Sequence, residues 1–421
     1  MFPSKPTRLK KNDSKRDPYA ALRSRDFRSF VLGVLFSVFG QQMLYMAVGW
    51  ELLDRTNSAM ALGMKGLFLG LPTVFFLLPA GHVSDRFSRR DVLMLTQVVT
   101  ALSSFGLMLI AYFKAPVPWI YATLLLAGVS QAFNNPARWS LAPQLVPSKD
   151  FANSVTWSST FFQIASVVGP AVGGFLLALW GTPFVFFLDG VCALVFVGLL
   201  LAVPRDKPSA PKEKITLRSL AAGLDHVWKT KTILAIITLD LFAVLIGGAV
   251  GMLPIFARDI LHCGKIGFGF LQAAPAFGAV GMAFLLSHLP IMKKVGKTLL
   301  WAVTGFGLTW IFFGLSETFG FSLFLLFVGG ALDNISVVIR GTLVQVLTPN
   351  SLRGRVSSVN SLFINTSNYL GDFESGLTTQ LWGPVRAVVI GGIGTLLIVV
   401  SVMAIWPELL KLGPLKGKES S

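Results

Sequence analysis

Five acidic residues stand within long apolar stretches of this 421-residue chain, where an ionised side chain is costly. Asp372 and Glu374 are two residues apart, whereas Asp189, Asp240 and Asp333 stand alone. Two carboxylates this close in a medium of low dielectric resist being ionised together, which suits a site that binds and releases a proton. A carboxylate paired with a cation from another segment is the alternative. We take all five as candidates for proton coupling, with Asp372 or Glu374 first.

Positions two apart on a helix point in different directions, so we expect only one residue of this pair to face a cavity. Two arginines, Arg138 and Arg340, lie near the ends of apolar stretches. We expect them to reach the membrane surface or to pair across a gate. Lys65, near the end of another stretch, is expected to reach water.

The composition requires that these stretches lie in lipid. Hydrophobic residues make up 53% of the chain and charged residues 13%, and the mean hydropathy is +0.68. Such a chain cannot cover a water-exposed surface. The net charge of +16 comes from short basic clusters between apolar runs, which indicates membrane topology and no nucleic-acid partner. Cys192 and Cys263 lack metal-ligand spacing, and we predict no metal or cofactor site.

A window of about 20 apolar residues predicts twelve membrane helices. Their predicted ranges are 28–52, 60–83, 92–113, 118–141, 153–180, 182–203, 233–256, 267–289, 298–315, 321–344, 357–381 and 385–406. We therefore predict an all-α membrane protein with a basic tail (1–27), a six-helix bundle (28–203), a linker (204–232), a second six-helix bundle (233–406) and a second tail (407–421). The linker places Leu217, Leu220, Leu224 and Trp228 at helical spacing, which predicts an amphipathic helix on the membrane surface. Placing both termini in the cytoplasm puts most basic residues on that side.

The two predicted bundles repeat each other at one constant shift along the chain. The matching pairs are Gly128 with Gly330, Arg138 with Arg340, Leu145 with Leu347, Pro147 with Pro349, Gly169 with Gly371 and Gly174 with Gly376. Six matches in one ungapped register indicate a duplication. In parallel repeats of this kind the substrate path lies between the halves.

Residues 81–93, GHVSDRFSRRDVL, form a short charged turn between two apolar runs. Gly81 allows close helix packing, and the carboxylate of Asp85 suits the partial positive charge at a neighbouring helix N-terminus. Arg86, Arg89 and Arg90 are expected to anchor the turn at the cytoplasmic side. We predict a conformational gate here; an ordinary basic cytoplasmic turn is the alternative.

The fifth apolar segment contains GPAVGG, with Gly169, Pro170, Gly173 and Gly174. Proline removes a backbone donor and bends a helix, while the glycines open a groove for close packing. A generic packing kink and a functional kink are both open from these residues alone.

The spacing G-x-x-x-D-R-x-x-R-R-x-x-L resembles the loop signature between the second and third helices of the major facilitator superfamily of transporters. Ser88 stands where that family usually has glycine. The stretches PARWSLAPQLVPSKDFANSV and VLTPNSLRGRVSSVN narrow the resemblance to the branch with the enterobactin exporter and macrolide efflux pumps. GPAVGG is similar to the antiporter signature of drug-exporting facilitators, although Ala165 stands where another glycine is usual. The resemblance implies twelve helices and export by proton antiport.

Polar and aromatic residues in the apolar segments are our candidates for the lining of a substrate cavity. They are Gln41, Gln42, Tyr45, Asn134, Asn135, Gln163, Asn334, Asn365 and Asn368, with Asp333 beside them. A roomy cavity of mixed amide and aromatic character suits a bulky amphiphile.

We therefore predict a monomeric carrier in a bacterial inner membrane that exports a siderophore-like or drug-like amphiphile in exchange for protons. An importer or a lysophospholipid flippase of the same fold is the alternative, and a nontransporting scaffold or sensor is a third possibility. An enzyme is disfavoured because the four histidines are scattered. A nucleotide-driven pump is disfavoured because the chain has no G-x-x-x-x-G-K-[ST] loop.

The predicted topology is tested with single cysteines near Arg89 and Lys294 in a variant without the two native cysteines. Both positions are expected to resist impermeant thiol reagents in intact cells and to react after permeabilisation. Strong labelling of both in intact cells contradicts the cytoplasmic placement.

Overall fold

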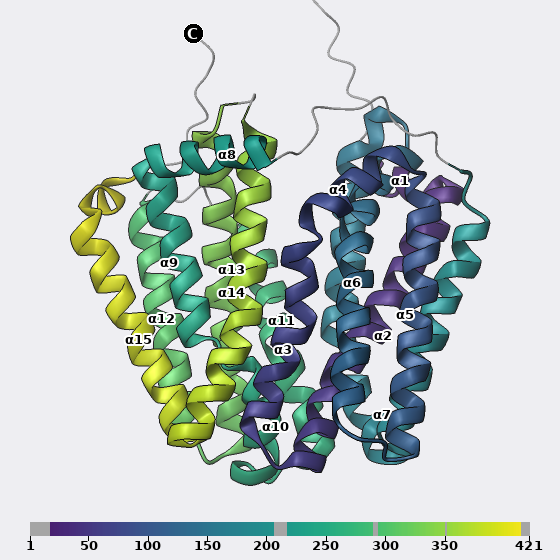
Figure 1. Cartoon of the computed structure of the whole chain (residues 1–421). Helices are drawn as coiled ribbons and strands as arrows, with labels where there is room; N and C mark the ends of the chain where they lie inside the picture. Colours follow the sequence, from purple (N-terminus) through teal and green to yellow (C-terminus); the bar gives the residue numbers. More distant parts are fainter. Residues whose placement is uncertain (1–16, 206–216, 289–293, 350–351, 414–421) are drawn as a thin grey trace, which may run out of the picture.

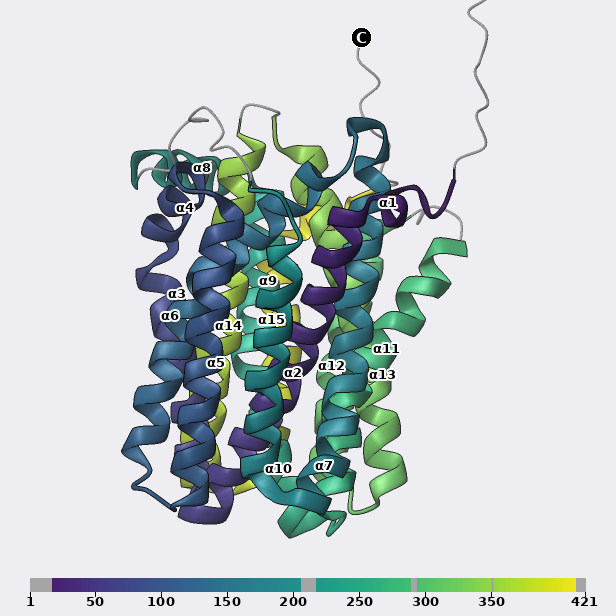
Figure 2. The same ribbon diagram turned by 90° about the vertical axis from the view of Figure 1, so that its right-hand side faces the viewer.

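The computed structural model describes residues 17–205, 217–288, 294–349 and 352–413, and at positions 77, 78, 85 and 217–220 it describes the backbone alone. All regular structure in the described ranges is helical. In both views the long helices run side by side from one end of the molecule to the other (Figures 1 and 2). We call the end that carries α1 and α8 the termini end, and the opposite end the far end.

The first half contains seven α-helices whose ends are fixed by local capping. Ser24 and Ser58 accept hydrogen bonds from the amides of Phe27 and Ala61, and Asn57 ends a helix in the left-handed conformation. The helices are α1 (Ala20–Arg23), α2 (Arg25–Thr56), α3 (Ala59–Phe75), α4 (Leu77–Arg86), α5 (Arg89–Tyr112), α6 (Pro118–Leu141) and α7 (Phe151–Leu201), with 3-10 turns η1 (Ala142–Leu145) and η2 (Ser148–Asp150).

The second half repeats this plan with one additional interruption, because its first long helix breaks at Gly248. Its elements are α8 (Leu217–Lys229), α9 (Lys231–Gly247), η3 (Val250–Met252), α10 (Leu253–Ile255), the π-helical η4 (Phe256–Ile260), α11 (Gly264–His288), α12 (Val295–Leu315), α13 (Phe319–Leu347), α14 (Arg353–Trp382), α15 (Pro384–Ile405) and η5 (Pro407–Lys411).

Each of the twelve predicted segments overlaps a helix of the structure. Among the described residues, eight helical stretches are long and apolar enough to cross a membrane. The fifth and sixth segments both lie within α7, which is divided into two helices at Gly181, because the φ of 76° and ψ of 178° there are not helical and are avoided by side-chain-bearing residues. The predicted charged turn is shorter than expected, because α4 continues to Arg86 and only Phe87 and Ser88 separate it from α5.

Ser88 explains how this junction is built without the expected glycine. Its φ is −58°, so no left-handed residue is required, and its hydroxyl accepts from the amide of Asp91 as the cap of α5. Arg90 donates to the carbonyl of Leu200 at 2.8 Å, which ties the start of α5 to the end of α7. The basic residues therefore anchor the first half internally.

The linker helix α8 lies across the termini end of the second half (Figure 1). Its buried face is formed by Gly223, which packs against the backbone of Arg355, and by Val227. Leu224 and Trp228, from the predicted apolar face, are exposed; the side chains of Leu217 and Leu220 lie outside the described part. Exposed apolar side chains on a helix in this position suit the interfacial region of a bilayer.

The two halves meet where α3 packs against α14 and where α7 packs against α11. At each crossing two glycines face each other. A Cβ atom added to Gly376 would lie 2.6 Å from the Cα of Gly63, and one added to Gly174 would lie 2.9 Å from the Cα of Gly269. The backbones are therefore in direct contact, as in membrane helix pairs joined through small residues.

The GPAVGG run is a packing surface. Inside α7 only Gly181 departs from helical dihedral angles, so the backbone at Pro170 remains helical. Gly169 and Gly173 accommodate Gln42 and Met43 of α2, while Gly174 contacts α11. The run thus joins α7 to its own bundle on one side and to the second half on the other.

A side chain at a glycine crossing is expected to force the halves apart. Gly376→Leu should destabilise the protein by about 1–3 kcal/mol, as overpacking does in other cores, and lower its thermal unfolding midpoint in detergent. Gly198→Leu is the matched control, because Gly198 lies on an exposed part of α7 with nothing within 4 Å of an added Cβ. Equal midpoints for the two variants contradict the packing account.

Candidate functional site

A chain of polar side chains crosses from the first half to the second. The amide of Gln41 donates to the hydroxyl of Tyr45 at 2.8 Å, and this hydroxyl donates to Gln131 Oε1 at 2.8 Å. From α14, the hydroxyl of Tyr369 donates to the same Gln131 oxygen at 3.5 Å. Gln41 and Tyr45 were expected here. Gln131 and Tyr369 were not, although each stands three residues before a predicted polar residue of its helix.

Asp372 lies at the α3–α14 crossing and contacts both halves. Its carboxylate accepts a hydrogen bond from the backbone amide of Gly251 and interacts with the charge of Lys65 on α3. Gly66 makes room for it, since an added Cβ would lie 2.5 Å from the Cβ of Asp372. Lys65 is half-buried, and the expectation that it reaches water stays a prediction.

The break after α9 explains why an acid is stable at this position. Where α9 gives way to η3, backbone groups lose their helical partners, and within a bilayer these must be satisfied by protein. Asp372 accepts from the Gly251 amide, and the Ser375 hydroxyl donates to the Gly248 carbonyl at 3.2 Å. The carboxylate therefore has a backbone partner in η3 and lies within electrostatic range of Lys65.

Glu374 is not among the groups that interact with Asp372. It is half-buried on α14, and the interactions found for Asp372 involve Lys65 and Gly251. The two carboxylates thus do not form one shared site. No ion pair of Asp372 is found among the described residues, so its pairing with a cation from another helix stays an alternative.

Two of the other acids are held inside one half each. Asp189 is 2% exposed and accepts a hydrogen bond from the Ser104 hydroxyl at 2.5 Å within the first half. Asp240 forms an ion pair with Arg340 in the second half, and both side chains are buried. Arg340 therefore neither reaches the membrane surface nor pairs across a gate, because its partner lies in its own bundle.

Asp333 lines a cavity of about 140 Å³ inside the second half, between α9, α11, α12, α13 and α14. Asn368 lines the same cavity, and its side-chain amide also donates to the Ile364 carbonyl at 2.8 Å. Asn365 is exposed on the preceding turn, and Asn334 is half-buried on α13 with a carbonyl oxygen that has no hydrogen-bond partner. Asp333 and Asn368 thus share a mainly apolar cavity of the second half, and Asn334 and Asn365 are not among its lining residues.

Three predicted cavity residues of the first half have different surroundings. Asn134 is buried and donates to the Thr96 hydroxyl at 3.0 Å, so its prediction as a cavity residue is wrong. Gln42 packs against Gly169, and Asn135 is half-buried on α6. Gln163 lines a groove between the halves, where it was expected.

This groove has a volume of about 610 Å³ and is lined by α7 and α11 alone. Its walls include Ser159 and Gln163 on α7, with Phe277 and Phe284 on α11. The same two helices touch at Gly174 and Gly269, nearer the far end. The halves are thus in contact towards the far end and separated by the groove towards the termini end.

Arg138 lies on α6 without an acidic partner. Its guanidinium is 5.6 Å from the ring centroids of both Trp139 and Phe162. In the part of the chain that the structure describes, no ion pair to Arg138 is found. The expected pairing across a gate is therefore absent from this conformation.

The gate residues lie at the termini end. Arg89 is buried and donates to Gln144 at 3.4 Å, Arg90 bonds to the end of α7, and Arg86 is exposed. Gly81 is half-buried within α4. The side chain of Asp85 lies outside the described part, so its predicted gate role stays a prediction.

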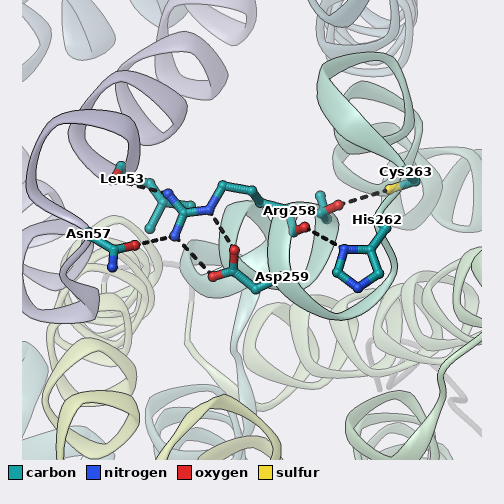
Figure 3. Close-up of polar contacts among 7 residues, drawn as sticks. Leu53, Asn57, Arg258, Asp259, His262 and Cys263 are labelled. Carbon is teal, nitrogen blue, oxygen red and sulfur yellow. Dashed lines mark hydrogen bonds and ion pairs between the residues drawn. The ribbon is translucent and has the colours of Figure 1, made fainter.

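A polar latch that the sequence did not reveal closes the far end (Figure 3). Arg258 of η4 reaches across to α2, where it donates to the Leu53 carbonyl at 3.3 Å and to the side chain of Asn57. Asp259 orients the guanidinium through bonds of 2.6 and 3.0 Å. Nearby, Gln380 of α14 accepts from the Ser58 hydroxyl at 3.2 Å.

Removal of the latch is expected to favour opening of the far end. Arg258→Gln loses a charge-assisted contact worth about 1 kcal/mol at a part-exposed site, which corresponds to a roughly fivefold change in the ratio of closed to open molecules. Spin labels at Lys114 and Glu317, on exposed far-end positions of opposite halves, should report a larger long-distance fraction. The control is Arg386→Gln, which replaces an exposed arginine of α15. If the spin-label distance distributions of Arg258→Gln and Arg386→Gln are identical, the latch is contradicted.

The fold of the whole chain is shared with solved membrane transporters. A bacterial homologue of the human lysosomal transporter Spinster, in an inward-facing unoccupied conformation, is 16% identical with a TM-score of 0.71, covering 92% of this chain and 97% of that one. The inward-open xylose transporter XylE from E. coli is 14% identical with a TM-score of 0.69, covering 93% and 97%. At these identities the likeness concerns the fold.

Sequence comparison narrows the relationship. The enterobactin exporter EntS of Escherichia coli O1:K1 / APEC is 24% identical over 384 residues, which is 91% of this chain and 92% of that protein. EntS of Shigella boydii serotype 18 gives the same values. The family model described as transmembrane secretion effector matches residues 16–412. The chain therefore belongs to the transmembrane secretion effector family of the major facilitator superfamily.

Proposed function

We propose that this protein is a secondary active exporter that moves a small amphiphilic molecule out of the cytoplasm by alternating access, in exchange for protons. The observation that carries the proposal is the arrangement of the halves. They touch through glycines and the Arg258 latch towards the far end, while a groove of about 610 Å³ separates α7 from α11 towards the termini end. A carrier needs two such arrangements, with access from one side at a time.

The basic residues support a cytoplasmic termini end. Arg86, Arg89 and Arg90 lie at the α4–α5 junction, and further basic residues flank the start of α12 and of α14. The positive-inside rule places such clusters in the cytoplasm. In this orientation the groove opens towards the cytoplasm, so this conformation loads substrate from inside the cell. We propose that the protein works as a monomer in the inner membrane of a bacterium.

The surroundings of the groove suit a bulky, partly polar molecule. Phe277 and Phe284 offer aromatic surface, while Ser159 and Gln163 offer hydrogen-bonding groups. The relatives named enterobactin exporter support a siderophore-like substrate, and the mixed lining also suits drug-like amphiphiles. We propose this substrate class in preference to small hydrophilic solutes.

Asp372 is the proposed proton-coupling residue because its charge state affects contact between the halves. As a carboxylate it interacts with Lys65 of the first half and with the Gly251 amide. Protonation removes the attraction to Lys65 and weakens the hydrogen bond from the amide. A proton at Asp372 thereby changes the free-energy difference between arrangements with the α3–α14 crossing closed or open.

The coupling role is tested with Asp372→Asn and Glu374→Gln in proteoliposomes with an imposed pH gradient. Asp372→Asn mimics the protonated state permanently, so accumulation against a gradient should fall at least tenfold while exchange down a gradient survives. Glu374→Gln, whose residue is not among the groups that interact with Asp372, is expected to retain accumulation. If both variants still concentrate substrate in response to the pH gradient, this pair does not couple transport, and Asp333 becomes the next candidate.

The groove also favours one second candidate, a lysophospholipid flippase. Because only α7 and α11 line it, and because Phe284 is 70% exposed, an acyl chain has a route from the groove to surrounding lipid. A fluorescent lysophospholipid in proteoliposomes separates the two functions. Movement of that lipid without any efflux of soluble amphiphiles supports the flippase, and the reverse supports the exporter.

A further inference from the structure

Arg138 and Arg340 are equivalent positions of the two repeats, but they have different partners. Arg340 is buried and forms an ion pair with Asp240 of α9. The same constant shift that relates the arginines relates Asp240 to Val38 of α2, a buried apolar residue. The first half therefore has the arginine of the repeated pair but has no acidic residue at the position that corresponds to its partner.

Helix α2 offers Arg138 apolar side chains and the Tyr45 hydroxyl, but no acidic side chain. Phe30 and Val34 line a small hollow together with Arg138, and Val38 follows one turn later on the same face. The guanidinium lies over the rings of Trp139 and Phe162. Two aromatic rings attract a cation, but they do not replace the anion that a partly buried guanidinium requires.

Arg138 stands on the face of α6 that is directed at the second half. Gln131, seven residues earlier and therefore on the same face, receives the hydrogen bond from Tyr369 across the interface. Arg138 lies two turns nearer the termini end, where the halves have separated. On α7, Ser158 and Phe162 border its hollow while the adjacent Ser159 and Gln163 line the groove.

A second hydrogen-bond donor, without a partner among the described residues, also borders the hollow. The Ser158 hydroxyl is buried and has no hydrogen-bond partner in the described structure, which is an unusual situation for a polar group at this depth. The hollow itself holds only about 10 Å³, so a ligand group binds at its mouth. The rings at that mouth, Trp139 and Phe162, are 51% and 39% exposed.

We propose that Arg138 binds an anionic group of the transported molecule, and that the substrate class is aromatic organic anions. The guanidinium donates to the carboxylate, sulfonate or phenolate, Ser158 supplies another donor, and the exposed rings pack against the aromatic part of the ligand. The substrate anion takes the place in the first half that Asp240 occupies in the second. The inference rests on the proposed function of the groove as the substrate path.

A pair of fluorescent probes isolates the charge. 8-Anilinonaphthalene-1-sulfonate is an aromatic anion, and N-phenyl-1-naphthylamine has the same aromatic skeleton without the sulfonate. Each is titrated into the full-length protein in nanodiscs, and the signal from empty nanodiscs is subtracted. Arg138→Gln should weaken binding of the sulfonate tenfold to a hundredfold and change that of the uncharged probe less than twofold. Arg138→Lys should recover part of the affinity for the sulfonate, because it restores the charge without the planar fork.

The control Arg386→Gln removes the same charge from an exposed position of α15 and should leave both affinities unchanged. Equal weakening of both probes by Arg138→Gln, or no weakening of either, overturns the proposal. Binding is measured without a gradient, so it is independent of transport. If Arg138→Gln weakens binding of the sulfonate alone and the protein shows no efflux in proteoliposomes, the anion site stands and the exporter function is refuted. If efflux occurs and Arg138→Gln does not change it, the exporter function stands and the anion site is refuted.

Discussion

Direct backbone contact between the halves is the constraint on which the rest of the structure depends. In lipid, the hydrophobic effect does not drive apolar helices together, so the halves need a contact that lipid cannot replace. Gly63 with Gly376 and Gly174 with Gly269 provide it, because any side chain at these crossings would separate the backbones. Both crossings lie towards the far end. The groove towards the termini end is the consequence, since helices that touch at one point diverge beyond it.

Polar groups determine how the contact between the two halves can be formed and broken. At the α3–α14 crossing, the break after α9 exposes backbone groups that Asp372 and Ser375 satisfy, and Lys65 brings a charge from the other half. Arg258 adds a latch closer to the far-end surface. These interactions are polar, so in the proposed transport cycle they are exchanged for water as the far end opens, while the apolar packing within each bundle is kept and the two halves move as units.

The fold was predictable from the sequence because its main signal is apolar length. Helix ends were less accurate, since helices such as α13 and α14 continue through polar residues beyond the apolar window. The site was predicted in part. Gln163 lines the groove and Gln41 and Tyr45 join a polar chain between the halves, while their roles and that of Asp372 stay predictions. Asn134 and Arg340 have partners inside their own bundles. The spacing of apolar residues predicts that a residue lies on a helix. It does not predict how the helix is rotated about its axis, which decides whether the residue faces the groove or a neighbouring helix. The Arg258 latch was missed because its partners, Leu53 and Asn57, lie about 200 residues away in the other half.

Movement of the far end is the central claim, and a covalent link across it is the most direct test. The side-chain oxygens of Ser58 and Gln380 approach to 3.2 Å from opposite halves, so cysteines at these positions, in a variant without Cys192 and Cys263, can be bridged by a short bifunctional methanethiosulfonate reagent that a reductant cleaves. Efflux of a fluorescent amphiphile from cells or proteoliposomes is then measured before and after reduction. The account predicts that the cross-linked protein does not transport and that reduction restores the rate. Full transport by quantitatively cross-linked protein would show that the far end need not open, and would contradict alternating access about these crossings.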